Sequence, residues 1–129
     1  MNIAFIGLGK LGLPCAEVIA EKGHNVTGYD IAKRGNNNVA QFPTIQGAIN
    51  GADIVFVAVP TPHDPDYDGR APTAHLEPKD FQYDIVKEVI AEANEHMTKD
   101  QLLVLISTVL PGTVRREFIP LVTNTRFVY

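Results

Sequence analysis

The sequence predicts one α/β domain built on a doubly wound parallel sheet. Short apolar runs rich in strand formers alternate with stretches at helical spacing, and a glycine-rich turn joins the first strand to the first helix. The length of 129 residues fits a single domain, and contents of 45% apolar and 20% charged residues are typical of a folded globular chain. We therefore expect residues 1–129 to form one domain.

The N-terminal part of the chain predicts a strand, a helix and a second parallel strand. Residues 2–6 are a short apolar run that stops at Gly7, as buried parallel strands often do. Apolar residues at helical spacing follow over residues 11–19, and Gly23 is the expected C-terminal stop of this helix. Residues 24–30 alternate as a strand does, so the crossover between the two strands is a helix.

The middle of the chain predicts one clear strand between two loops. Residues 31–43 predict a polar loop, and residues 43–51 a short helix that starts near Thr44. The apolar run at residues 53–59 is the clearest buried strand. Five of the nine prolines fall within residues 60–78, so this segment is expected to be a long loop of the kind that often carries function.

The last third predicts two more strands and two more helices. Asp80 is the expected N-cap of a helix, residues 101–107 form a buried strand, and Pro111 suits the first turn of the next helix. Residues 126–129 begin a strand that we expect to be truncated. The apolar faces of the two helices are expected to consist of Ile85, Val86, Val89, Ile90, Ala93 and Met97, and of Val114, Phe118 and Leu121.

A Gly-x-Gly-x-x-Gly pattern at residues 7–12 gives the strongest local indication of function. It follows a strand, opens a helix and precedes Asp30 at the end of the second strand, which is the full context of a Rossmann-type dinucleotide site. The helix N-terminus would present amides to the pyrophosphate, and Asp30 would accept hydrogen bonds from ribose hydroxyls. Its carboxylate favours NAD over NADP, whereas Lys33 and Arg34 nearby could favour a 2′-phosphate.

Two further turns follow predicted strands. Residues 59–62 and residues 107–113 lie where the carboxyl ends of parallel strands bind ligands in doubly wound sheets. Thr61 and Thr108 could each direct a hydroxyl at a cofactor or a reacting centre, or they could serve only as ordinary turn residues.

The motif at residues 3–14, the Val-Pro-Thr-Pro turn at residues 59–62 and the Ser-Thr-Val-Leu-Pro-Gly-Thr segment at residues 107–113 occur in order. Together they resemble the NAD-binding domain of the UDP-glucose/GDP-mannose dehydrogenase family over nearly the whole chain. The resemblance implies two successive NAD-dependent oxidations at C6 of a nucleotide sugar, as in the conversion of UDP-glucose to UDP-glucuronate. Here the segment between the second strand and the Pro-Thr-Pro turn is shorter than is usual in the family.

The resemblance also assigns roles to individual residues. It implies that the backbone of Leu11 meets the pyrophosphate, that Asp30 binds ribose, that Thr61 contacts NAD, and that Thr108 contacts NAD and positions the catalytic water. Fingerprint and resemblance together predict a set of cofactor-binding residues: Gly7, Leu8, Gly9, Lys10, Leu11, Gly12, Asp30, Ile31, Lys33, Arg34, Pro60, Thr61 and Thr108.

The same resemblance predicts that this chain binds NAD without turnover. The family's thiol nucleophile, lysine, central helix and nucleotide-sugar domain lie downstream of Tyr129, so a nucleotide sugar and the family's homodimer would require those parts. Cys15 is no substitute, because it falls on the apolar face of the first helix. The alternatives are the cofactor domain of a β-hydroxyacid dehydrogenase, and a standalone NAD-sensing or interaction module.

Composition excludes several other functions. The net charge of −4 and the lack of a basic run argue against nucleic acid, and the single cysteine rules out an internal disulfide or a cysteine-based zinc site. Residues 64–69 resemble the start of a calcium loop, but the position that needs glutamate holds His75, so we expect no metal. No targeting or membrane segment is predicted, and the cytoplasm is the expected location.

Overall fold

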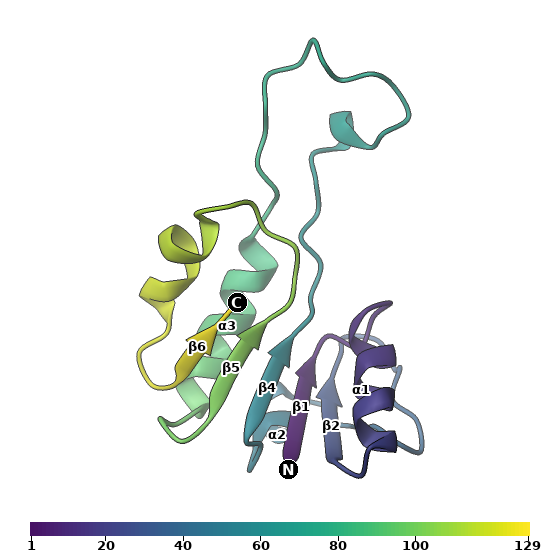
Figure 1. The fold of residues 1–129 in the computed structure, drawn as a ribbon, viewed down its shortest axis with the longest axis vertical. Coiled ribbons are helices and arrows are strands. Elements are labelled where there is room, and N and C mark those ends of the chain that lie inside the picture. Colours follow the sequence, from purple (N-terminus) through teal and green to yellow (C-terminus); the bar gives the residue numbers. More distant parts are fainter.

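The apolar runs form one six-stranded parallel sheet in the computed structural model, which describes residues 1–129 (Figure 1). The strand order β3-β2-β1-β4-β5-β6 is that of a Rossmann-type sheet, so the predicted fold class is confirmed. The strands are β1 Asn2–Ile6, β2 Asn25–Tyr29, β3 Ala40–Gln41, β4 Ile54–Val57, β5 Leu102–Leu105 and β6 Arg126–Val128.

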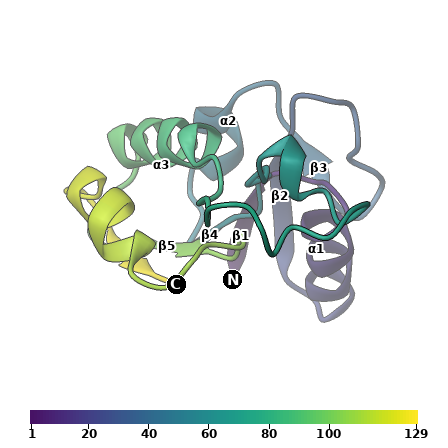
Figure 2. The ribbon, with the colours of Figure 1, turned by 90° about the horizontal axis from the view of Figure 1, so that it is seen from above.

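Helices cover both faces of this sheet (Figure 2). One face is covered by α1, whereas α2, α3 and the short helices after β5 lie on the other. As predicted, α2 starts near Thr44, and the Thr44 hydroxyl caps it by accepting the Gly47 amide at 3.1 Å. The helices are α1 Gly12–Glu21, α2 Ile45–Ile49, α3 Asp84–His96, the 3₁₀ turns η1 Pro65–Tyr67 and η3 Ile119–Leu121, and the π-helical η2 Val114–Phe118.

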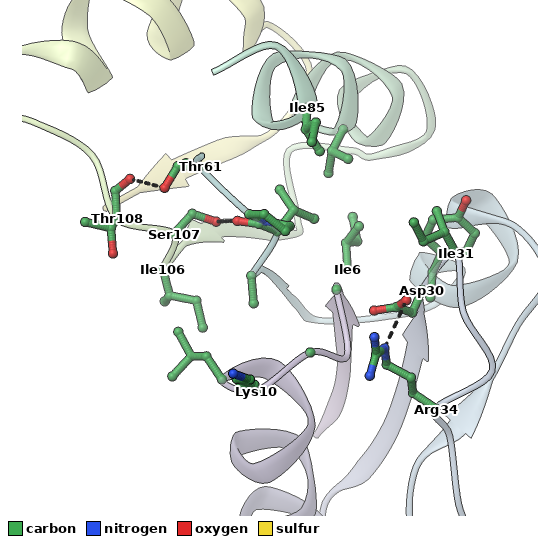
Figure 3. Close-up of a pocket in the computed structure, with 18 residues that line it drawn as sticks. Ile6, Lys10, Asp30, Ile31, Arg34, Thr61, Ile85, Ile106, Ser107 and Thr108 are labelled. Atoms are coloured by element: carbon green, nitrogen blue, oxygen red, sulfur yellow. Dashed lines mark hydrogen bonds and ion pairs between the residues drawn. The ribbon is translucent and has the colours of Figure 1, made fainter. Parts of the chain in front are cut away.

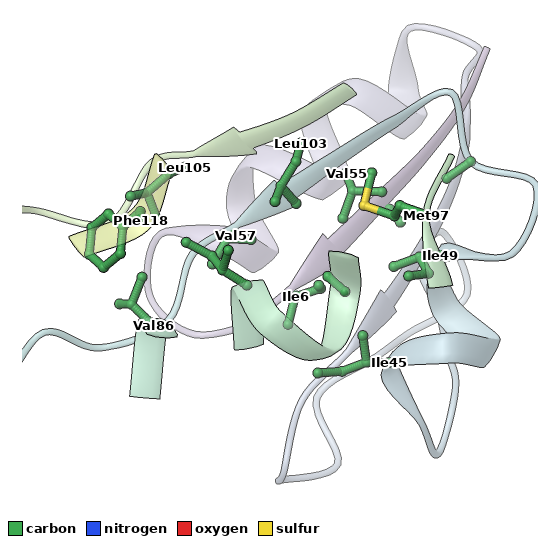
Figure 4. Packing of buried hydrophobic residues seen from close by; sticks show 14 of the residues in the cluster. Ile6, Ile45, Ile49, Val55, Val57, Val86, Met97, Leu103, Leu105 and Phe118 are labelled. Carbon is green, nitrogen blue, oxygen red and sulfur yellow. The ribbon is translucent and has the colours of Figure 1, made fainter. Parts of the chain in front are cut away.

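The two faces of the sheet bury two separate apolar clusters. Successive residues of β1 alternate between them: Phe5 packs towards α1, and Ile6 belongs to the sixteen-residue cluster under α2 and α3 (Figure 4). Phe118 is fully buried at one end of the larger cluster, with its ring edge-on to Tyr83 at 5.8 Å. Burial on both faces explains why the strands are continuous apolar runs.

Two predicted helix starts were wrong. Asp80 does not cap α3, which begins at Asp84, because the Asp80 carboxylate instead accepts hydrogen bonds from Tyr83 and Arg116. Pro111 lies ahead of its helix, because Gly112 takes a left-handed φ of +87° that interrupts the chain before η2 begins.

Two loops contain structure that the sequence did not predict. The polar loop at residues 31–43 contains β3, which pairs with β2 at the sheet edge. Residues 58–83 rise from the end of β4 as a long arm, with η1 near its far end (Figure 1). Within the arm Lys79 pairs with Asp64 at 2.9 Å, and no group of three or more His, Cys, Asp or Glu side chains is arranged to hold a metal.

None of the helices combines the length and the apolar character that crossing a membrane requires.

The packing of Phe118 predicts a large loss of stability on truncation. Phe118→Ala should lower the free energy of unfolding by about 3–5 kcal/mol, because it removes a fully buried ring and leaves a cavity. Ile119→Ala is the matched control: the adjacent side chain is 52% exposed, and its loss should change stability by about 0.5 kcal/mol or less. Urea unfolding of both variants measures the difference, and equal losses would contradict the assigned packing.

Candidate functional site

The main pocket lies at the carboxyl ends of β1, β2, β4 and β5 (Figure 3). This is the point where the strand order reverses, between β1 and β4, and open α/β sheets bind ligands there. Its volume is about 540 Å³, which is in the range of small-molecule sites. Its lining consists of Ile6, Gly7, Gly9, Lys10, Leu11, Tyr29, Asp30, Ile31, Arg34, Ala58, Val59, Pro60, Thr61, Ile85, Val89, Ile106, Ser107 and Thr108.

The three glycines of the turn at residues 7–12 differ in what an added side chain would meet. Gly7 has a φ of +96°, and a Cβ there would lie 2.5 Å from the Ala58 carbonyl oxygen. A Cβ on Gly12 would lie 1.9 Å from the Gly7 carbonyl oxygen, so only glycine lets α1 approach β1 this closely. A Cβ on Gly9 would meet no protein atom within 4 Å. Protein packing thus requires Gly7 and Gly12, while Gly9 leaves its space open to a ligand.

The N-terminus of α1 offers unpaired amides to this pocket. The helix has no side-chain cap, and no acceptor in the protein bonds the amides of Gly9, Lys10 or Leu11, which line the pocket. Free N–H groups and the positive end of the helix dipole favour an anion at this place. Together with the open space at Gly9, they form a cradle of the kind that a pyrophosphate occupies.

Asp30 lies at the end of β2, on the pocket wall. One of its carboxylate oxygens accepts the Leu8 amide at 2.8 Å, and the other accepts the Ala32 amide at 2.8 Å. The first oxygen retains an acceptor position, because a carboxylate oxygen can accept two hydrogen bonds. Asp30 therefore both fixes the glycine turn and can accept a hydrogen bond from a ligand hydroxyl.

Of the two basic residues after Asp30, Arg34 lies in the pocket and Lys33 does not. Arg34 lines the pocket, with its Nε atom 3.4 Å from the Asp30 carboxylate. Ile31 lines it too and is 96% exposed. Lys33 instead lines a separate surface hollow, together with Gly35 and Gln41, and is not part of the pocket lining. Of the other expected residues, Leu8 and Gly12 are buried below the lining and act through the Leu8 amide and the close packing at Gly12.

The turns after β4 and β5 are tied together. The Thr61 hydroxyl donates to the Thr108 carbonyl oxygen at 2.7 Å, and the Ser107 hydroxyl donates to the Val59 carbonyl oxygen at 2.7 Å (Figure 3). Thr61 thus has a structural role in addition to lining the pocket. The Thr108 hydroxyl has no hydrogen-bond partner in the protein, so it is free to bond a ligand or a water molecule.

Sequence reasoning missed several lining residues. Ile85 and Val89 were expected on the apolar face of α3. Both line the pocket, and Val89 also packs against the larger apolar cluster. Periodicity places them on an apolar face but does not indicate that this flank of the helix faces a crevice. Ser107 belongs to the segment 107–113 that the sequence singled out. Its position next to Thr108, at the end of a strand, could have predicted that it lines the pocket.

Tyr83 clamps the loop that carries Thr108. Its hydroxyl donates to Asp80 and accepts the Leu110 amide at 3.1 Å. The hydrogen bond from Tyr83, followed by those from the Phe81 amide and Arg116, holds the pKa of Asp80 below its usual value. The clamp connects the base of α3 to residues 107–113.

Comparison with known proteins identifies the family to which this site belongs. A sequence profile described as the UDP-glucose/GDP-mannose dehydrogenase family, NAD binding domain, matches residues 32–127. That span excludes the glycine-rich turn, so the geometry of residues 7–12 is evidence independent of the profile.

Individual relatives agree with the profile. The chain is 29% identical over 140 residues to a UDP-N-acetyl-D-mannosamine dehydrogenase of Pyrococcus horikoshii, covering 90% of this chain and 30% of that protein. It is 28% identical over 138 residues to a UDP-glucose 6-dehydrogenase of Rickettsia typhi, covering 88% of this chain and 29% of that protein. The chain therefore spans about 30% of the length of these relatives.

A solved structure confirms the fold. The GDP-mannose dehydrogenase of Pseudomonas aeruginosa, solved as a ternary complex, superposes with a TM-score of 0.77 at 21% identity. The similarity covers 98% of this chain and 35% of that one.

The contrast between two glycines predicts separable effects on binding and folding. Gly9→Ala should fold with near wild-type stability but lose NAD affinity by about tenfold or more, because its methyl group would occupy open space beside the free amides. Gly12→Ala should lower the free energy of unfolding by more than about 2 kcal/mol, because its methyl group collides with backbone. Thermal unfolding and calorimetric titration distinguish the two, and a well-folded Gly9→Ala variant with unchanged affinity would refute the cradle.

The Tyr83 clamp predicts a change in acid sensitivity. Because the folded protein lowers the pKa of Asp80, the stabilisation from its hydrogen bonds is complete above the usual pKa of about 3.9 and is lost as the pH falls through the folded value. Tyr83→Phe removes the donor and should raise the pKa of Asp80 towards that usual value, as measured by NMR titration. Tyr67→Phe, which loses a hydroxyl in the arm, should leave it unchanged.

Proposed function

Because the chain belongs to the UDP-glucose/GDP-mannose dehydrogenase family and forms its NAD-binding domain, we propose that it supplies the cofactor half of a nucleotide-sugar 6-dehydrogenase. The reaction would oxidise the C6 primary alcohol of a nucleotide sugar to a carboxylate in two NAD-dependent steps, as from UDP-glucose to UDP-glucuronate. The observation that carries the proposal is a pocket lined both by Asp30 and by Gly9, Lys10 and Leu11, whose amides have no partner in the protein. The relatives named above, which act on UDP-sugars by name, support this substrate class.

The residues present fit the cofactor at each end of the pocket. The free amides of Gly9, Lys10 and Leu11 would hold the pyrophosphate, and the remaining acceptor position of Asp30 would bond a ribose hydroxyl. The Asp30 carboxylate would repel a 2′-phosphate, which favours NAD over NADP. Thr61, Thr108 and Pro60 line the other side of the pocket, at the ends of β4 and β5, where we place the reacting end of the cofactor.

Bound NAD would supply the hydride acceptor for each oxidation step. Among this chain's own residues, the free hydroxyl of Thr108 is the group that could orient a water molecule near that end. The titratable residues of the lining are Lys10, Tyr29, Asp30 and Arg34, and the lining contains no thiol. Cys15 lies on α1 and packs against the smaller apolar cluster. We therefore propose that this chain binds NAD but that the nucleophile and sugar site come from other residues of the complete enzyme.

Two other functions are compatible with this fold. The cofactor domain of a β-hydroxyacid dehydrogenase would share the fold, but the family profile over residues 32–127 favours the nucleotide-sugar enzyme. A standalone NAD-sensing module would use the same pocket, but the relatives that the chain matches are much longer enzymes. We also propose a cytoplasmic location, as expected from the sequence, and, for the complete enzyme, a homodimer, which follows from the family resemblance.

The proposal predicts binding without turnover. Calorimetric titration of this chain should detect NAD binding with a Kd below about 1 mM and weaker binding of NADP. Mixing the chain with NAD and UDP-glucose should produce no NADH absorbance, because the pocket lining contains no thiol to act as the family's nucleophile. A folded chain that fails to bind NAD would refute the cofactor assignment, whereas NADH formation would refute the division of roles.

A further inference from the structure

Gln41 in the edge strand β3 holds the loop that follows Asp30. Its side-chain oxygen accepts the amides of Arg34 and Gly35, each at 2.7 Å. Its side-chain nitrogen donates to the carbonyl oxygens of Asp30 at 3.1 Å and Ala32 at 2.7 Å. A carboxamide has two donor hydrogens and two acceptor positions, so every donor and acceptor of the Gln41 side chain bonds this one loop.

The packing around Gln41 is correspondingly close. A Cβ on Gly35 would lie 2.6 Å from the Cβ of Gln41, so the loop is drawn onto this side chain. In contrast, β3 is only two residues long and pairs with β2 alone, so sheet pairing contributes little to holding the segment. The Gln41 carboxamide is therefore the main tie between residues 30–35 and the edge of the sheet.

This tie controls both partners of the ion pair at the pocket wall. Gln41 binds the backbone of Asp30 and the backbone of Arg34, whose side chains lie 3.4 Å apart. The Arg34 side chain is 50% exposed, and ion pairs with such exposure are weak on their own. The position of the guanidinium therefore depends on its anchored backbone more than on its attraction to Asp30.

We propose that Gln41 is a positioning residue that sets the preference of the ribose site for a hydroxyl over a 2′-phosphate, an inference that rests on the proposed NAD site. With the loop anchored, Arg34 stays beside Asp30 and the carboxylate remains the group that faces the ribose. Without the anchor, Arg34 can leave Asp30 and pair with a 2′-phosphate, for which a guanidinium is well suited.

The test compares two glutamines that bridge backbone groups in similar ways. Gln41→Met removes all four hydrogen bonds at nearly constant side-chain length. It should raise the Kd for NAD by about tenfold and change the Kd for NADP by less than about threefold. Gln101→Met is the matched control, because Gln101 binds the backbone of Thr98, Ile49 and Ala52 and lies outside the pocket lining. It should lower the melting temperature without changing the ratio of the two dissociation constants.

A double-mutant cycle tests whether Gln41 acts through Arg34. In an Arg34→Gln background, Gln41→Met should no longer reduce the difference between the dissociation constants for NAD and NADP. The cation that would bind the 2′-phosphate is absent there. Gln41→Asn is a milder variant whose amide is too short to reach both sides of the loop, and it should narrow the ratio in the same direction.

Three results would overturn the inference. A Gln41→Met or Gln41→Asn chain that keeps the wild-type NAD/NADP ratio would exclude this role for Gln41 while leaving NAD binding intact. A Gln101→Met chain that narrows the ratio equally would show that the effect is one of general stability. A folded wild-type chain that binds neither dinucleotide would overturn the proposed function and this inference together.

Discussion

The close approach of Gly12 to the Gly7 carbonyl is the contact on which the site depends. No side chain fits between these two backbones, so α1 begins directly against the end of β1. The unpaired amides of the helix are thereby brought to the mouth of the crevice between β1 and β4. A wider separation would keep the same fold but would carry the positive end of the helix away from the pocket. The anion cradle thus follows from a steric constraint.

The apolar core and the polar rim of the pocket, meaning the hydrogen-bonded turns after β4 and β5, have different roles in building this site. Burial of β1 and β4 on both faces fixes the depth and direction of the crevice, but hydrophobic stabilisation is non-directional and cannot orient a loop. Orientation comes from hydrogen bonds at the rim, where Thr61 joins the two turns that follow β4 and β5 and Tyr83 anchors the second of them. The core therefore determines where the pocket lies, and the rim determines which groups face into it.

Local signals in the sequence were enough for every strand of the sheet except β3 and for the glycine turn. Buried strands produce apolar runs, and residues 7–12 with Asp30 form a pattern with a known geometric cause. Asp80 failed as a predicted cap because its carboxylate bonds Tyr83, three residues on, and Arg116, which the tertiary structure brings to it. An N-cap can be recognised from neighbouring residues, but competition for its carboxylate cannot.

The same reasoning explains the other misses. β3 has only two residues, too few to show an alternating pattern. Ile85 and Val89 fit the helical period of the core face, and only the position of α3 beside the crevice places them in the pocket. The motif residues of the candidate site were therefore predictable in type, whereas the residues that complete its walls and hold its loops required coordinates.

The chemistry of the loop after β2 explains why a glutamine, and no charged residue, can hold it. The loop presents two carbonyl oxygens and two amides to one side chain, so that side chain must donate twice and accept twice. A glutamate would oppose its carboxylate to both carbonyl oxygens, and a lysine would offer the two amides no acceptor. An asparagine has the right groups but lacks one methylene of reach. The requirement comes entirely from backbone groups, so it is independent of which side chains the loop presents to the ligand. An edge strand of two residues can therefore influence a binding site that its own side chains do not line.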